Sequence, residues 1–171
     1  DNQAAKGLGL GASNFYDPVV NKNYDKKVVH AGPRHLDIEN ETMPVSITMD
    51  GKYDHPNVFV DGDPATNLQY LDYVDNVDPS LKSDRKINNI VQTSLGVQMK
   101  RTIYAFAHPD HQNYHIQEYV FTNNGCFDKD CNTSYEQTLE GFQVYLQYIY
   151  AISREGMVYD GNWLPQSAAR G

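Results

Sequence analysis

The chain has 171 residues, a formal net charge of −8 and an apolar fraction of 40%. Such an acidic chain argues against nucleic acid and anionic membranes as partners, because phosphate groups bind basic surfaces. Its apolar segments are also shorter than the roughly 20 consecutive apolar residues that a membrane-spanning helix needs. The composition therefore predicts a soluble module with a modest core and no membrane insertion.

The first forty residues differ from the rest of the chain because they are rich in glycine and alanine. Alternating Gly and Leu over residues 7–11 is too flexible to hold a helix. One interpretation is a disordered tail. The other is an arm that orders against a neighbouring subunit, in which Leu8 and Leu10 alternate with glycine as in a strand and form an interface. We expect residues 1–42 to form this extended arm and a loop.

From Met43 onward, short strand-like runs alternate with turn residues. Residues 45–49 alternate in polarity, and the following Asp50-Gly51 is typical of a tight hairpin turn. Residues 58–60 form the next run and lead into a second turn over 61–64. The polar stretch over 68–83 predicts a long surface loop.

The second half of the chain predicts three longer strands. Residues 90–106 are rich in β-branched and aromatic side chains, with Gly96 at a bulge or bend. Strands over 114–122 and 141–153 follow, and the pattern predicts an antiparallel meander.

These strands indicate an all-β fold: an antiparallel β-sandwich over residues 43–171, of Ig-like or supersandwich type, with the extended N-terminal arm before it. The strands are too few to complete a sandwich. We therefore expect either a longer polypeptide or strands supplied by a partner chain.

The chain has two cysteines, Cys126 and Cys131, separated by four residues. A spacer of this length fits a disulfide across a turn, while zinc would need further ligands that the sequence does not offer nearby. The cysteines therefore predict a disulfide that staples a hairpin tip, with free thiols as the alternative.

Acidic residues gather in two predicted loops and suggest a calcium site, because calcium prefers carboxylate and carbonyl oxygens. The candidate ligands are Asp61, Asp63, Asp72, Asp75 and Asp78. Aspartate is also common in turns because its side chain caps the backbone. Calcium is the one cofactor that the sequence suggests, and the alternative is that the protein has none.

We expect no enzyme, because the sequence lacks a Gly-x-Ser-x-Gly or His-Glu-x-x-His motif. His108, His111 and His115 lie near Asp110 and would bind zinc or copper if a turn brought them together. Histidines at a hairpin tip are more often solvated residues without a ligand.

Tyrosine is unusually frequent, with 13 Tyr against a single Trp. Its ring and hydroxyl suit protein interfaces and stacking on sugars. Tyr145 lies opposite Phe142 and Val144 in the predicted alternation, so it is exposed if that sheet has a solvated face. Tyr145 and Tyr70 are the candidate interface or ligand-stacking aromatics.

One part of the chain resembles large secreted bacterial surface proteins, many of them exported by the type IX route. In these proteins a strand ending in Asn-x-Gly closes an Ig-like or supersandwich β-layer. The resemblance spans about residues 58–125 and implies an extracellular setting without assigning catalytic residues. The residues that carry it are 60–66, 75–80, 89–97, 101–104 and 114–125.

These observations together predict an extracellular structural or adhesive subunit of the cell surface that self-assembles by strand donation. Its partners would be other copies of itself or other surface proteins. The alternative is a carbohydrate-binding module, dependent on calcium or not, that belongs to a larger secreted enzyme and binds polysaccharide.

Overall fold

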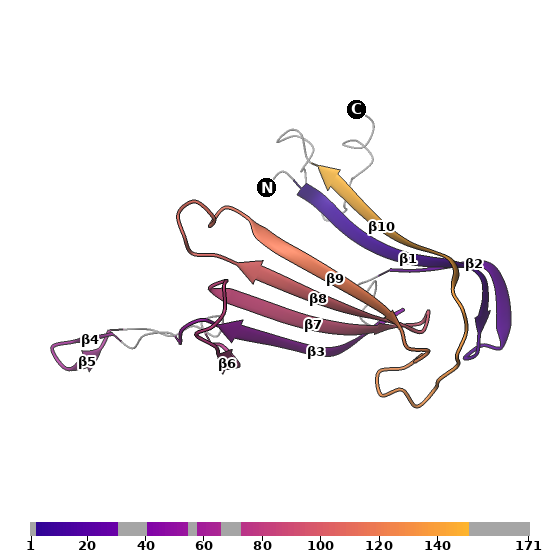
Figure 1. Cartoon of the computed structure of the whole chain (residues 1–171), viewed down its shortest axis with the longest axis horizontal. Coiled ribbons are helices and arrows are strands. Elements are labelled where there is room, and N and C mark those ends of the chain that lie inside the picture. Colours follow the sequence, from indigo (N-terminus) through magenta and orange to yellow (C-terminus); the bar gives the residue numbers. More distant parts are fainter. Residues whose placement is uncertain (1–2, 31–40, 55–57, 66–72, 151–171) are drawn as a thin grey trace, which may run out of the picture. The chain divides into compact units, whose positions relative to one another are not determined.

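The computed structural model describes residues 3–30, 41–54, 58–65 and 73–150 (Figure 1). These residues form strands and turns and contain no helix, so the fold class is all-β, as the sequence predicts. The strand pairs are antiparallel except for β3 (Thr42–Gly51) with β6 (Asn76–Val77), which is parallel. This arrangement is consistent with an incomplete β-sandwich.

The chain forms two compact units, which we call unit 1 and unit 2. Unit 1 contains the described residues of Asp1–Met43, Thr93–Gly96 and Gly125–Gly171, and unit 2 contains those of Pro44–Gln92 and Val97–Asn124. The sequence predicted a division into residues 1–42 and 43–171, whereas both units draw on more than one segment of the chain. The N-terminal segment belongs to the same unit as the C-terminal part of the chain, which the sequence did not indicate.

Unit 1 contains a three-stranded sheet in the order β10-β1-β2. Its strands are β1 (Gln3–Asp17), β2 (Lys22–His30) and β10 (Glu140–Tyr150). The segment that was predicted as an arm thus provides the central strand, with Leu10 opposite Val144 on one side and Val29 on the other. Because side chains alternate between the two faces of a strand, the glycines of residues 7–11 lie on one face of β1 and the leucines lie on the other.

The core of unit 1 lies on the leucine side of β1. Leu10 and Val29 are fully buried, and Phe15 is 1% exposed. The Phe15 ring lies 6.3 Å from that of Phe127, which comes from the loop before β10. Leu95, in the turn over residues 93–96, is also fully buried. Unit 1 therefore combines apolar side chains from three distant parts of the sequence.

Unit 2 contains a five-stranded sheet in the order β6-β3-β7-β8-β9 and a separate small hairpin. The remaining strands are β7 (Arg85–Thr93), β8 (Val97–Ala105) and β9 (His115–Asn123) in the sheet, and β4 (Phe59–Val60) and β5 (Asp63–Pro64) in the hairpin. Asp61 and Gly62 join β4 to β5 with φ of 53° and 88°. Positive φ at both positions is typical of a tight hairpin turn, so the turn predicted over 61–64 is present.

The structure corrects the predicted strand over residues 90–106. Two strands, β7 and β8, replace it, and they pair as a hairpin around residues 94–96. Gly96 has φ of 71° and donates its N–H to Thr93 O at 3.1 Å. A left-handed glycine closes a turn here, whereas the sequence suggested a bend within one strand.

The predicted hairpin turn at Asp50-Gly51 is also wrong. Both residues lie in β3 and pair with Asn76 and Val77 of β6. A Cβ atom at position 51 would lie 2.8 Å from Val74 Cγ1 and 2.9 Å from Tyr53 O. Glycine is therefore needed here for close packing and not for a turn.

The predicted meander is correct for β8 and β9 but not for the last strand. β9 pairs with β8, while β10 pairs with β1 in the sheet of unit 1 (Figure 1). The long connection over residues 124–139 carries the chain from one sheet to the other.

Candidate interaction surfaces

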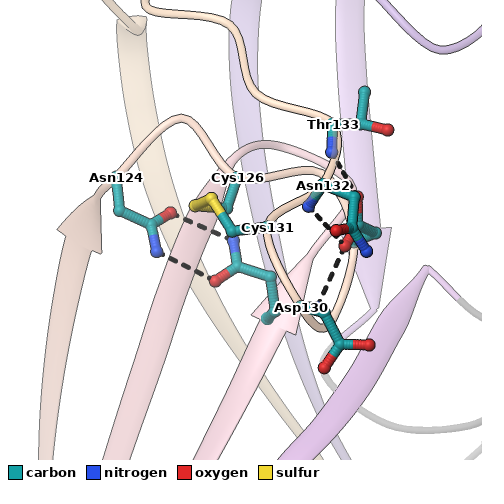
Figure 2. Close-up of a disulfide and its surroundings, with 8 residues drawn as sticks. Asn124, Cys126, Asp130, Cys131, Asn132 and Thr133 are labelled. Atoms are coloured by element: carbon teal, nitrogen blue, oxygen red, sulfur yellow. Dashed lines mark hydrogen bonds between the residues drawn. A yellow bond between two sulfur atoms is a disulfide. The ribbon is translucent and has the colours of Figure 1, made fainter.

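The loop over residues 124–139 precedes β10 and contains the predicted disulfide. Cys126 and Cys131 are bonded, with their Cα atoms 4.8 Å apart (Figure 2). The Asp128 carboxylate accepts hydrogen bonds from the backbone N–H groups of Asp130, Asn132 and Thr133. The amides of Asn132 and Thr133 are the main reason that the pKa of Asp128 lies below its usual range.

This loop supplies a core residue and offers no open ligand site at Asp128. Phe127 is 5% exposed and donates its N–H to Thr133 O at 2.9 Å. The carboxylate of Asp128 is directed at the amides of its own loop, as in an Asx turn. The disulfide and the carboxylate therefore fix the loop in a shape that delivers Phe127 to the core of unit 1.

Gly7, Gly9 and Gly11 of β1 lie on one face of the unit 1 sheet, which we call the glycine face. The strand register places Gly9 beside Tyr145 on β10, and Gly11 beside Val28 on β2. Tyr145 is 61% exposed and Val28 is 58% exposed. Gly7, Gln143, Gln147 and His30 complete this face. This face thus presents one exposed aromatic ring and two exposed amide side chains along β10.

The opposite face of the same sheet carries apolar side chains, which are buried on β1 and β2 but partly exposed on β10. Leu10 and Val29 are fully buried, while Val144 and Leu146 on β10 are 43% and 48% exposed. The register places Val144 beside Leu10 and Leu146 beside Leu8. Half-exposed apolar side chains next to a buried core indicate a surface that can bind another apolar element.

The predicted interface residues that the structure describes differ in their exposure. Tyr145 is exposed on the glycine face, whereas Leu10 is part of the core and Leu8 is only partly exposed. Tyr70 lies outside the described residues.

The structure describes four of the five predicted calcium ligands, and they do not form a group of three that could hold a metal ion. Asp61 and Asp63 are exposed in the β4–β5 hairpin. Asp75 accepts a hydrogen bond from the Met49 N–H at 2.6 Å, and Asp78 accepts two from Ser80. Asp72 lies outside the described residues. Within residues 3–30, 41–54, 58–65 and 73–150, no three acidic, histidine or cysteine side chains are arranged to hold a metal ion.

The histidines lie at the tip of the β8–β9 hairpin, where aromatic rings pack on one another. The His108 and His111 ring centroids are 5.5 Å apart, and Tyr114 OH lies 2.6 Å from His111 Nδ1. His108 Nδ1 accepts the Asp110 N–H at 3.2 Å. His115 instead contacts Gln117 on β9. Each of these three histidines thus has one ring nitrogen in a local hydrogen bond: Nδ1 of His108, Nδ1 of His111 and Nε2 of His115.

A buried ion pair in unit 1 was not found from the sequence. Lys27 Nζ on β2 contacts Asp17 Oδ2 at the end of β1, and these side chains are 15% and 7% exposed. Burial raises the pKa of Asp17, but the hydrogen bond and charge of Lys27, with the amides of Val20 and Val19, lower it further, so its pKa lies below the usual range. The sequence signal was weak: β2 contains Lys22, Asp25, Lys26 and Lys27, but nothing in this pattern pairs Lys27 with Asp17.

No family model, curated protein or solved structure matches the chain. Within the described part of the chain, no helix is long and apolar enough to cross a membrane. The surfaces described above therefore carry the functional argument.

Proposed function

We propose that the protein is an extracellular structural or adhesive subunit of the cell surface that self-associates by adding strands at the β10 edge. The observation that carries this proposal is the half exposure of Val144 and Leu146 beside the fully buried Leu10. An added strand would place its own side chains beside Val144 and Leu146 and reduce their exposure. The Cys126–Cys131 disulfide supports an oxidising compartment such as the cell exterior.

The two edges of this sheet differ in charge, and the difference favours β10 as the edge that pairs. β2 carries Lys22, Asp25, Lys26 and Lys27, and charged side chains protect an edge against pairing. β10 carries only Glu140, at its first residue, and is otherwise rich in aromatic and aliphatic side chains.

The partner that we propose is a second copy, with its β10 antiparallel to the first. Such a contact is two-fold symmetric, so each copy presents the same surface to the other. Donation of the N-terminal segment is a less favourable route, because β1 already pairs on both sides within its own sheet. Removing it for a partner would break two ladders.

The test compares the molar mass in solution of the unmodified protein with that of two charge variants. V144K/L146K adds two charges to the β10 edge, and V19K/V20K adds the same charges at exposed positions of the β1–β2 turn. We expect the unmodified protein and V19K/V20K to form dimers or larger assemblies, and V144K/L146K to be monomeric by size exclusion with light scattering. A monomeric unmodified protein over the accessible concentration range would overturn the proposal, as would assembly of all three proteins.

The glycine face favours a second candidate function, the binding of carbohydrate. Tyr145 is 61% exposed, and the face of an exposed tyrosine ring can stack on a sugar ring. Gln143 and Gln147 on the same face provide donors and acceptors for sugar hydroxyls.

A glycan array with Tyr145→Ala and Tyr114→Ala tests this second function. Tyr114 is an exposed tyrosine of unit 2, so its variant is a matched control. Carbohydrate binding predicts a signal that is lost in Tyr145→Ala and kept in Tyr114→Ala. No bound glycan, or equal loss in both variants, contradicts it.

A further inference from the structure

The buried pair of Lys27 and Asp17 has the geometry of two groups that can react with each other. Lys27 Nζ contacts Asp17 Oδ2 and also donates a hydrogen bond to Ser94 O at 3.0 Å. The Phe15 and Tyr24 ring centroids lie 5.1 and 5.8 Å from Nζ. Aromatic rings and a fixed backbone carbonyl thus hold the amine against one oxygen of the carboxyl group.

The other oxygen of the same carboxyl group is held by backbone donors. Asp17 Oδ1 accepts hydrogen bonds from the N–H groups of Val19 at 3.0 Å and Val20 at 3.3 Å. Two fixed amides on one carboxyl oxygen are the arrangement that stabilises an oxyanion when a nucleophile adds to the carbon. The carboxyl group is therefore oriented with Oδ2 toward the amine and Oδ1 in a pocket of donors.

We propose that Lys27 and Asp17 condense to an intramolecular amide that covalently links β2 to the end of β1. The Nζ lone pair attacks Asp17 Cγ, and a C–N bond forms while negative charge develops on Oδ1 between the two amides. The C–Oδ2 bond then breaks, and Oδ2 leaves as water with protons taken from Nζ and from the protonated carboxyl group. No oxidant or cofactor is consumed.

The resting state of the pair determines how fast this reaction runs. The lowered pKa of Asp17 keeps its carboxyl group in the carboxylate form at neutral pH, in contact with Lys27 Nζ. A proton must therefore pass from Nζ to Oδ2, which are already in contact, to give the amine and carboxylic acid that react. The contacts described for these two side chains include no third carboxyl group to assist the transfer. Condensation is thus slower than folding, and the high effective concentration of the two groups drives it in the folded state.

Unit 2 contains an ion pair that serves as an internal comparison. Lys86 Nζ lies 2.8 Å from Asp50 Oδ2, and these side chains are 24% and 13% exposed. The Asp50 oxygens accept hydrogen bonds from the side-chain amides of Asn76 and Asn88. Water reaches this pair more readily and no pair of backbone amides holds its carboxyl group, so we expect it to remain an ion pair.

Intact-mass spectrometry of the folded chain, fresh and after prolonged incubation at neutral pH, tests the proposal. The incubated protein should have the sequence mass less the two disulfide hydrogens and less one water molecule. Peptide mapping should find the peptides that contain residues 17 and 27 joined, and no link between residues 50 and 86. Because the unmodified protein gives the result, no variant has to fold for the test to be decisive.

Two variants assign the chemistry to these side chains. Lys27→Arg keeps a cation beside Asp17 but has no comparable nucleophile, and Asp17→Ala removes the electrophile. Neither should lose water on incubation, while Lys86→Arg should lose it as the unmodified protein does. If the incubated unmodified protein has lost only the two disulfide hydrogens, or if the loss of water maps to another position, the proposal is overturned. This outcome is independent of self-association at β10.

Discussion

Each unit contains a lysine–aspartate ion pair, and the pair in unit 1 is more deeply buried. In unit 1 the Lys27 and Asp17 side chains are 15% and 7% exposed and lie beside the Phe15 ring. In unit 2 the Lys86 and Asp50 side chains are 24% and 13% exposed. They belong to a row of polar side chains in the sheet that also includes Tyr104 with Glu118, and we call it the polar row.

This difference shows where the chain depends on particular residues. A buried aromatic pair and a buried charge leave large penalties when one partner is removed, because the remaining group lies in a cavity or stays unpaired. A pair that water reaches more readily loses less, because water replaces part of the lost interaction. We therefore expect single substitutions in unit 1 to cost more than matched substitutions in unit 2.

The largest effect is expected for Phe15→Ala, which should lower the free energy of unfolding by about 3–5 kcal/mol. Phe15 is 1% exposed and packs against Phe127, so its loss leaves a cavity in unit 1. Phe59→Ala is the control, because Phe59 is 61% exposed, and should change stability by about 0.5 kcal/mol or less. Urea unfolding measures both. Equal effects would mean that Phe15 is not a core residue.

Lys27→Met and Lys86→Met compare the two ion pairs directly. Lys27→Met leaves Asp17 buried without its cation and should cost about 3 kcal/mol. Lys86→Met should cost about 1 kcal/mol, because Asp50 keeps its hydrogen bonds from Asn76 and Asn88. Hydrogen exchange should locate the first loss in β1 and β2 and the second in β3 and β7. A larger cost for Lys86→Met would reverse the comparison.

The disulfide should matter to unit 1 by a smaller amount. C126S/C131S releases a short loop, and the chain-entropy estimate for such a loop is about 2 kcal/mol. The loop delivers Phe127 to the core, so hydrogen exchange should increase in β1 and β10. Exchange in β8 and β9 is the internal control. An unchanged unfolding midpoint would show that the hydrogen bonds to Asp128 hold the loop without the disulfide.

Substituting one glycine in each unit should reverse the order of the effects, because the glycine in unit 2 is more closely packed than the one in unit 1. Gly51→Ala should cost about 1–3 kcal/mol, since a new Cβ would overlap Val74 and Tyr53 O. Gly9→Ala should change stability by about 0.5 kcal/mol or less, because its nearest atom, Val29 O, is 3.7 Å away. Thermal unfolding of both variants decides this. A severe effect of Gly9→Ala would show that the glycine face is already covered by another part of the protein.

Local patterns in the sequence predicted the fold class, β9, the Asp61-Gly62 turn and the disulfide, because each depends on neighbouring residues. They failed where pairing is non-local. β1 was interpreted as an arm because its glycines provide no side chains to pack, yet β2 and β10 stabilise it from both sides. The exposure of Tyr145 was predicted by alternation alone, but its position beside Gly9 depends on the register of β1 with β10. The pair of Lys27 and Asp17 depends on a turn near residue 94 that no local pattern connects to β2.

The smallest expected effect is the pH dependence contributed by Asp50 in unit 2. Hydrogen bonds from Lys86 and Asn76 lower the pKa of Asp50 below its usual range. A carboxyl group with a lowered folded-state pKa stabilises the protein above its unfolded-state value of about 3.9 and loses that contribution as the pH falls. The difference in unfolding free energy between the unmodified protein and Asp50→Asn should therefore stay constant above about pH 5 and shrink as the pH falls through about 3.9 toward the folded-state pKa. Asp63→Asn, at an exposed position, is the control. A constant difference as the pH falls below about 5 would mean that the Asp50 carboxylate does not contribute to the stability of unit 2 through its charge, and that the polar row acts through its neutral hydrogen bonds.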